Sequence, residues 1–346
     1  MTLLHTWEKN PALVKPIKRN EVQFMSSISI VILCTILAYM CLLIGVGIYN
    51  AKKNNSSEDF YLGGRKMGAL VVAMSAEASD MSSWLLMGLP GVAYLTGLAD
   101  AFWTAAGLAI GTYLNWLFTA KRLRRYTHVT GSFTLPQFFS NRFHDKKSVL
   151  AAISALIIIV FFIPYTASGF AACGKLFNAL FGADYMFAMI ISAIVIVGYT
   201  AAGGFLAAST TDFIQSIVMT IAILAILIFA TVTAGGIGAV MENAKALPGY
   251  LSFTSTHAAA TNSAEPYGFL KIVSTLAWGL GYFGMPHILL RFMAIENENK
   301  LKLSRRVASV WVVIAMGLAV LIGIAGRALS SSGVISMLSG SDTETI

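Results

Sequence analysis

Charge is scarce in this sequence: Asp, Glu, Lys and Arg make up 12% of the chain, while apolar residues make up 57%. Soluble domains carry about 25% charge, so this composition excludes an ordinary water-soluble domain. Cysteine is scarce too. The three cysteines form no CxxC or Cys/His cluster, which indicates neither a disulfide framework nor a zinc site. The start of the chain does not resemble a signal peptide, because the first apolar run is long and has no small-residue cleavage site.

What the chain does contain is long apolar runs. A helix needs roughly 20 apolar residues to cross the ~30 Å hydrocarbon layer of a membrane. Eight runs approach this length, at residues 28–49, 68–95, 99–118, 149–177, 185–205, 213–235, 269–289 and 307–328. We therefore predict an all-α, multi-pass protein of the plasma membrane.

The basic residues predict the orientation of these spans. Lysine and arginine are concentrated in loops 50–67 and 119–148 and in the loop after the seventh span, so these loops should face the cytoplasm. The run KRLRR at 121–125 follows a span directly, which favours a topology signal over a nucleic-acid patch, and we predict no nucleic-acid partner. Residues 1–24 are polar and would lie outside; our hypothesis is that translation begins at Met25.

The second span carries two carboxylates, Glu77 and Asp80, at membrane depth, where a charge costs several kcal/mol and is a functional candidate by default. A continuous helix over 68–95 would be about 42 Å long, so it should be tilted or broken. Serines at 75–83 favour a break, which is tolerated only beside a buried cavity. Freed carbonyls and Asp80 would suit a monovalent cation. There are two alternatives. The two carboxylates could form a proton relay in place of a cation site, or the helix could be tilted and unbroken, with its serines bonded to its own carbonyls.

The seventh span contains a GxGxxG match beginning at Gly279, but no βαβ unit surrounds it, so a dinucleotide site is excluded. Its glycines and Pro286 instead predict a second break in a helix. Trp278 and Tyr282 are four residues apart and share a helix face, which suits a pocket for an apolar solute.

Four other features allow simpler interpretations. A GxxxG pair at 107–111 predicts close helix packing. In the fourth span Pro164 should kink the helix, and Tyr165 could face a solute or be a buried tyrosine. Asp212 is interpreted as the N-cap of the sixth span, and His287 as a structural hydrogen-bonding residue.

Two broken spans with four unbroken ones between them predict two inverted repeats of five helices. An extra helix at 28–49 would precede the first repeat at 68–235, and the second repeat would begin at 269–328 with only two of its five spans. Residues 25–346 are therefore expected to form an incomplete transporter domain. No covalent chemistry is implied, so we predict that the protein is not an enzyme.

Five segments carry a family resemblance, namely DFYLGGR at 59–65, MSAEASDMSSWLLMGLPG at 74–91, FFIPYTASG at 161–169, GGFLAASTTD at 203–212 and WGLGYFGMPHILLRFMA at 278–294. They resemble the sodium/solute symporter family, and most of all its sodium/proline symporters, from Met25 to about Ala328. The resemblance implies a LeuT-type inverted-repeat fold preceded by one helix, importing L-proline with sodium by alternating access.

The same resemblance implies a role for each matching residue. Sodium would be bound by the backbone carbonyls of Ala78 and Met81 and the carboxylate of Asp80. Proline would be bound by five residues: Ser82, Tyr165, Trp278, Tyr282 and Pro286. Arg65 and Asp212 match positions near the cytoplasmic gate and in the ion path, where Glu77 is a further candidate.

Three residues depart from the family pattern: Glu77 and Ser83 replace usual glycines, and Met285 replaces a usual glutamine. Proton coupling, or a different solute such as pantothenate or another amino acid, therefore stays open. A transporter-like sensory domain joined to a histidine kinase is the alternative from another class. Membrane lipid is the expected surrounding, with no obligate protein partner.

Overall fold

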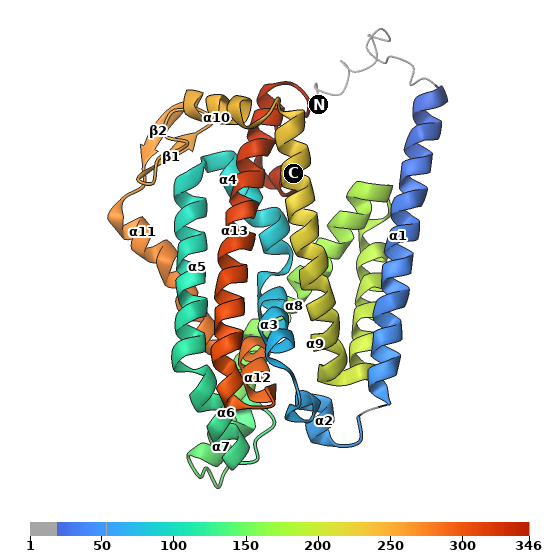
Figure 1. Cartoon of the computed structure of the whole chain (residues 1–346), viewed down its shortest axis with the longest axis vertical. Coiled ribbons are helices and arrows are strands. Elements are labelled where there is room, and N and C mark those ends of the chain that lie inside the picture. Colours follow the sequence, from blue (N-terminus) through green and yellow to red (C-terminus); the bar gives the residue numbers. More distant parts are fainter. Residues whose placement is uncertain (1–18, 53, 346) are drawn as a thin grey trace, which may run out of the picture.

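The computed structural model describes residues 19–52 and 54–345 as a bundle of helices whose axes run largely along one direction (Figure 1). The exception in the described part is a two-stranded antiparallel hairpin, in which β1 (Ser255–Ala258) pairs with β2 (Ser263–Pro266). The predicted all-α, multi-pass architecture is confirmed.

Four helical stretches of the described residues are each long and apolar enough to cross a membrane unaided. They are Ile30–Ala51 within α1 (Arg19–Ala51), α8 (Val149–Phe181), α9 (Tyr185–Thr233), and Glu298–Ser331, which joins the short η5 (Glu298–Lys300) to α13 (Leu301–Ser331). α8 continues through Pro164 without leaving helical conformation.

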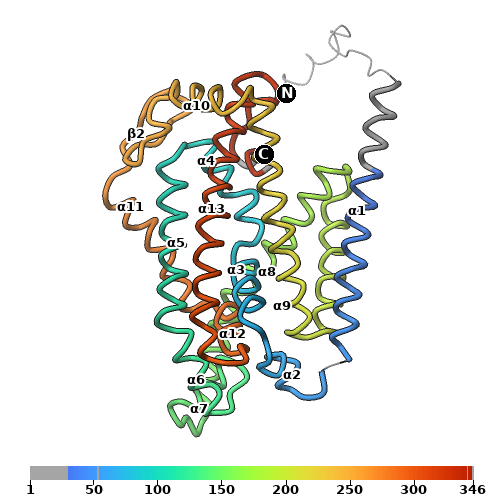
Figure 2. The backbone as a smooth tube through the Cα atoms, in the orientation of Figure 1, coloured from blue at the N-terminus to red at the C-terminus, as the bar shows by residue number. Residues whose placement is uncertain are grey.

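α9 contains two of the predicted spans. Gly204 has φ 63° and ψ −160° within it, a conformation that glycine adopts far more readily than other residues. The chain reverses at this point, and Figure 2 shows the two arms of α9 running in opposite directions. The predicted separation of the fifth and sixth spans is confirmed at Gly204.

The other predicted spans are α5 (Leu98–Phe118) and two helices that are interrupted. The second span consists of α3 (Ala69–Ser83), η3 (Trp84–Gly88) and α4 (Leu89–Thr96). The seventh consists of α11 (Phe269–Leu276), η4 (Ala277–Gly284) and α12 (Pro286–Ala294).

The short elements of the basic loops gather at one end of the bundle (Figure 1). They are α2 (Ser57–Leu62), η2 (Gly63–Arg65), α6 (Ala120–Val129) and α7 (Leu135–Arg142). α10 (Ile237–Ala246) and the hairpin lie at the opposite end, and η6 (Gly340–Thr345) packs against α4. This separation agrees with the predicted orientation, so we call the basic end cytoplasmic. The proposed extension at residues 1–24 lies largely outside the described residues.

The buried core is formed mainly by the interrupted second span, α5, α12 and α13. α8 and residues 30–51 of α1 expose most of their apolar side chains. In a membrane such surfaces face lipid, so the packed part of the molecule is the part that surrounds the two interrupted helices.

Candidate functional site: a cavity between two interrupted helices

The second span breaks at Ser82, whose φ of 45° and ψ of −160° are not helical. A positive φ is uncommon for a residue that is not glycine, and it reverses the course of the backbone locally. The next five residues, Trp84–Gly88, form a π-helical turn before α4 begins. The alternative of a continuous tilted helix is therefore wrong, and the break falls at one residue within 75–83.

The seventh span breaks differently. Residues Ala277–Gly284 form a 3-10 helix, and Met285 then adopts an extended conformation with φ −75° and ψ 107°. Pro286 begins α12, where its fixed φ and missing N–H are favourable. The predicted second break is confirmed at the position that glycine and proline mark.

Three glycines hold this second break against α5. A Cβ at Gly111 would lie 2.3 Å from the carbonyl oxygen of Gly279, and a Cβ at Gly279 would lie 2.0 Å from that of Gly107. The side-chain amide of Asn115 also donates a hydrogen bond to the carbonyl of Tyr282 at 2.8 Å. The GxxxG pair is thus a packing motif, as predicted, and its partner is the glycine-rich turn.

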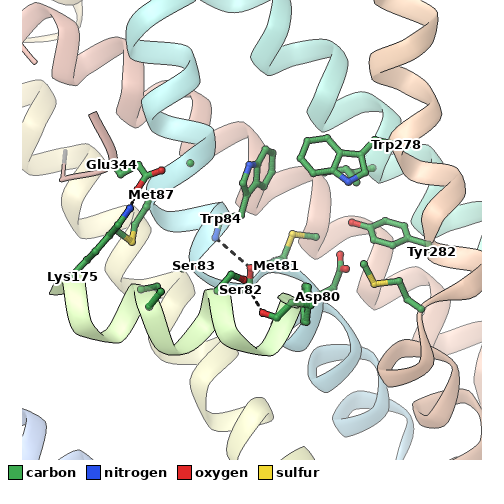
Figure 3. A pocket seen from close by; sticks show the side chains of 17 residues that line it. Asp80, Met81, Ser82, Ser83, Trp84, Met87, Lys175, Trp278, Tyr282 and Glu344 are labelled. Carbon is green, nitrogen blue, oxygen red and sulfur yellow. Dashed lines mark hydrogen bonds and ion pairs between the residues drawn. The ribbon is translucent and has the colours of Figure 1, made fainter. Parts of the chain in front are cut away.

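A cavity of about 490 Å³ lies where the two breaks meet. Figure 3 shows Asp80, Ser82, Trp278 and Tyr282 around it, with Lys175 and Glu344 at its far end. Six of the predicted site residues line it: Asp80, Met81, Ser82, Tyr165, Trp278 and Tyr282. Ser83 and Met285, two of the three departures from the family pattern, line it as well.

The cavity walls are connected by specific contacts. The Tyr282 hydroxyl lies beside the Asp80 carboxylate. The Tyr165 hydroxyl donates to the carbonyl of Ser79 at 3.3 Å, which ties α8 to the end of α3. Trp84 and Trp278 meet edge to face, with ring centroids 5.0 Å apart. Each contact joins one interrupted helix to another element. The cavity lining is therefore assembled from three parts: the interrupted second span, the interrupted seventh span and α8.

Two predicted ligands do not line the cavity. Ala78 lies in the last turn of α3, and Pro286 directly follows the lining residue Met285. The carbonyl of Met81 accepts a hydrogen bond from the N–H of Trp84. The sodium and proline roles of all these residues stay predictions.

Glu77 is separate from the cavity. It is buried, and its carboxylate accepts a hydrogen bond from the indole N–H of Trp116 on α5 at 3.2 Å. The ring of Trp116 in turn packs on Phe292 of α12, with centroids 4.4 Å apart. The two carboxylates of the second span therefore have different surroundings, one in the core and one in the cavity.

Asp212 is not the N-cap we predicted. It lies inside the second arm of α9, two turns beyond Gly204, because the helix resumes at that glycine. Its carboxylate pairs with the guanidinium of Arg291 at 2.6 Å and accepts hydrogen bonds from the hydroxyls of Ser75 and Ser79 at 2.8 and 3.1 Å. Asp212 thus links α9 to α3 and α12.

Arg65, a predicted gate residue, is buried near the cytoplasmic end. Its guanidinium donates to the backbone carbonyls of Met293 at 3.0 Å, Thr127 at 3.1 Å and Ser132 at 2.7 Å. It also pairs with Glu58 at 2.8 Å. Burial lowers the pKa of Arg65, and the Glu58 carboxylate opposes this effect. Arg65 therefore joins three separate segments.

Further contacts close the same end. Arg124, from the KRLRR run, is buried and donates to the carbonyl of Ile295 at 2.7 Å. Met67 and Ile295 form a short parallel bridge. The N–H of Met67 donates to the carbonyl of Ala294 at 3.3 Å, and the N–H of Glu296 donates to the carbonyl of Met67 at 3.0 Å. Part of the basic run therefore binds α12, in addition to any effect on topology.

His287 differs from the prediction as well. Neither ring nitrogen has a hydrogen-bond partner among the described residues, although both are shielded from solvent. The ring stacks on Tyr165 with centroids 5.6 Å apart and planes at 20°. Its neighbours are aromatic, so the structural role is packing.

The sequence reasoning missed Arg291, which we had assigned to a cytoplasmic loop. Its side chain is 6% exposed and bonds to Ser75 at 2.7 Å as well as to Asp212. One signal was available, since Arg291 belongs to the last of the five segments that carry the family resemblance, at 278–294, although it follows the predicted seventh span at 269–289. The ion pair between Lys175 and Glu344 at 2.9 Å, at the outer end of the cavity, was also missed because it joins distant segments.

Comparison with known proteins agrees with this architecture. The family model described as sodium:solute symporter family matches residues 60–341. Sodium/proline symporters of Staphylococcus aureus strains USA300 / TCH1516 and JH9 are each 43% identical over 295 residues, covering 85% of this chain and 56% of theirs. The chain thus spans about half the length of the curated relatives it matches.

A solved structure of a Na+-coupled sialic acid symporter, in a substrate-bound outward-open state, superposes with a TM-score of 0.73. Sequence identity is 16%, and the match covers 89% of this chain and 63% of that one. The fold and site define a polytopic helical membrane protein of the LeuT type. The chain belongs to the sodium:solute symporter family.

Proposed function

We propose that this protein imports L-proline together with sodium, by alternating access across the plasma membrane. The observation that carries the proposal is the cavity where two interrupted helices meet. It contains one carboxylate without an ion-pair partner among the described residues, Asp80, and aromatic and hydroxyl side chains suited to a small zwitterion, while its other carboxylate, Glu344, is paired with Lys175. The family membership, and the sodium/proline symporters among the relatives, support it further.

Asp80 would supply the charge for sodium, together with carbonyls at the end of α3. None of the ion pairs among the described residues involves Asp80, so its carboxylate has no protein cation to compete with sodium. Trp278 and Tyr282 would contact the proline ring, because an apolar ring and an aromatic face bury area from each other. Ser82 and Tyr165 would provide hydroxyls for its polar groups.

The cavity reaches from Asp80 towards Lys175 and Glu344. Lys175 is near the end of α8 that is farther from the basic loop 119–148, and Glu344 is in η6, which packs against α4. The cytoplasmic side is closed by Arg65, Arg124 and the Met67–Ile295 bridge. This is the arrangement of an outward-facing state. Sodium that stabilises it would raise proline affinity, and proline would raise sodium affinity by the same factor.

The test uses the purified chain in liposomes, with labelled proline and separately imposed sodium and proton gradients. We expect proline binding that requires sodium, and uptake driven by the sodium gradient. Ser82→Ala should weaken proline binding by about tenfold, the effect of one hydrogen bond to a charged group. Ser154→Ala is the matched control, because Ser154 on α8 bonds carbonyls of its own helix.

The alternatives predict different outcomes. Binding that follows the proton gradient would replace sodium with proton coupling. Sodium binding without proline binding would transfer the proposal to another solute, such as pantothenate or a different amino acid. Proline uptake that is indifferent to sodium would contradict the proposed coupling directly.

A further inference from the structure

Two neighbouring hollows lie at the cytoplasmic ends of α5, α6 and α13, away from the central cavity. One has a volume of about 590 Å³ and is lined by α5 and α6, and the other, of about 340 Å³, extends to α13. Leu117 and Lys121 line both hollows, so the two adjoin along a shared wall. Neither is used by the proposed transport mechanism.

Basic side chains dominate this pair of hollows. Five cations line them: Lys121, Arg122, Arg125, Lys302 and Arg305. One carboxylate is present. Glu298 binds Arg125 through two contacts of 2.6 and 3.1 Å and lies 4.0 Å from Lys121.

The remaining three cations have no carboxylate partner among the described residues. Arg305 lies over the ring of Tyr113, 5.3 Å from its centroid, and its Nε is shielded from solvent without a hydrogen-bond partner in the described part of the chain. A shielded donor without a partner is costly, and an anionic acceptor would satisfy it. The hollows therefore have an excess of positive charge and an unsatisfied donor.

The wall above the hollows is apolar and faces outwards. Ile110 and Leu117 on α5 and Val310 and Val313 on α13 are 54, 39, 59 and 60% exposed. These helices pack against each other. The hollows are lined by residues where α5 ends and α13 begins, and Figure 1 shows these two helix ends on the side of the basic loops. A ligand here would place a negative group among the cations and an apolar tail along the two helices.

We propose that the pair of adjoining hollows at the ends of α5, α6 and α13 binds the phosphate headgroup of an anionic phospholipid of the cytoplasmic leaflet, with one acyl chain lying along α5 and α13. Basic pockets between spans on the cytoplasmic side are suited to anionic headgroups. A free phosphate would satisfy the cations but leave the apolar wall uncovered. The site needs both parts of the lipid.

The test is native mass spectrometry of the purified chain, with phosphatidylglycerol or phosphatidylcholine added at equal amounts. We expect selective retention of phosphatidylglycerol. Each basic residue near the surface contributes roughly fivefold to affinity for anionic lipid, so the triple variant Arg122→Gln, Lys302→Gln, Arg305→Gln should bind it on the order of 100-fold more weakly. Circular dichroism checks that the variant keeps its helix content.

Two further variants complete the test. Lys146→Gln with Lys147→Gln removes two cytoplasmic cations outside the hollow and should leave retention unchanged. Glu298→Gln releases Arg125 and should strengthen binding roughly fivefold, which tests the site without removing a cation. Equal retention of both lipids, equal loss in the triple variant and the Lys146/Lys147 variant, or displacement by glycerol phosphate at the same concentration as by lipid, would overturn the proposal.

Discussion

Asp80 and Asp212 are both carboxylates at membrane depth, on an interrupted helix and on a helix that reverses direction, yet their surroundings are opposite. Asp212 is enclosed by Arg291, Ser75 and Ser79, which supply one charge and two hydroxyl donors. Asp80 has no ion-pair partner among the described residues and faces the cavity beside Tyr282. A carboxylate that is paired with a protein cation holds helices together, whereas a carboxylate without a protein cation is open to a ligand.

The difference also separates two faces of one helix. Ser75 and Ser79 lie on the face of α3 that meets α9 and α12, while Asp80 lies at its end, beside the break at Ser82. The same short segment therefore contributes to an internal ion-pair network and to the proposed sodium site. Displacing one would shift the other, since both depend on where α3 ends.

Replacing Asp80 should have the largest effect. Asp80→Asn keeps the size of the side chain and removes its charge, so sodium affinity should fall on the order of 100-fold, the value of a strong charged contact. The measurement is a sodium titration followed by the fluorescence of Trp84 and Trp278, which line the cavity. Sodium affinity within threefold of the parent chain would refute the contrast between the two aspartates.

Breaking the Asp212–Arg291 pair should mainly lower the free energy of unfolding, whereas replacing Asp80 should mainly lower sodium affinity. Arg291→Gln leaves Asp212 buried without a cation, at a cost of about 3–5 kcal/mol in the free energy of unfolding. The double variant with Asp212→Asn should recover part of that loss, because no unpaired charge remains. Unfolding in mixed micelles of increasing SDS content is measured for the parent, for both single variants and for the double variant, and strictly additive losses would contradict a direct pair.

The contact between α5 and the second break gives an intermediate effect. Gly279→Ala places a methyl group against the backbone of Gly107, so the turn must move away, at roughly 1–3 kcal/mol. Gly281→Ala is the matched control, because no atom lies within 4 Å of a Cβ there. Unfolding free energy and proline binding are measured on both, and equal losses would show that the close contact is unimportant.

Glu77 should matter least to ligand binding. Glu77→Gln keeps an acceptor for the indole N–H of Trp116, so sodium affinity should stay within about threefold of the parent. Glu77→Gly should also bind sodium, with a helix destabilised by about 1 kcal/mol. A shift of the sodium requirement in the first variant, comparable with that of Asp80→Asn, would assign Glu77 to the ion site and revive the proton-relay alternative.

Much of this arrangement was predictable because it rests on local rules. Apolar run length gave the spans, glycine and proline marked the break at Met285, and Gly107 and Gly111 indicated a close contact. The positions of Asp212 and Arg291 were not predictable in this way. Their pairing spans 79 residues along the chain, and an aspartate after Ser-Thr-Thr has the local pattern of an N-cap whichever partner it finds. The hydrogen-bonding role predicted for His287 was wrong for a similar reason, since its stacking on Tyr165 depends on tertiary packing.

The cytoplasmic closure through Arg65 has a consequence for timing. One guanidinium binds carbonyls of α6, of the loop after it and of α12, and all three bonds share one rigid plane. A small outward shift of α12 would therefore strain several bonds without freeing the path, and only their joint loss would open it. In the proposed transport cycle such a latch would set an activation barrier, so Arg65 would govern how often the cytoplasmic side opens more than how tightly the cavity binds.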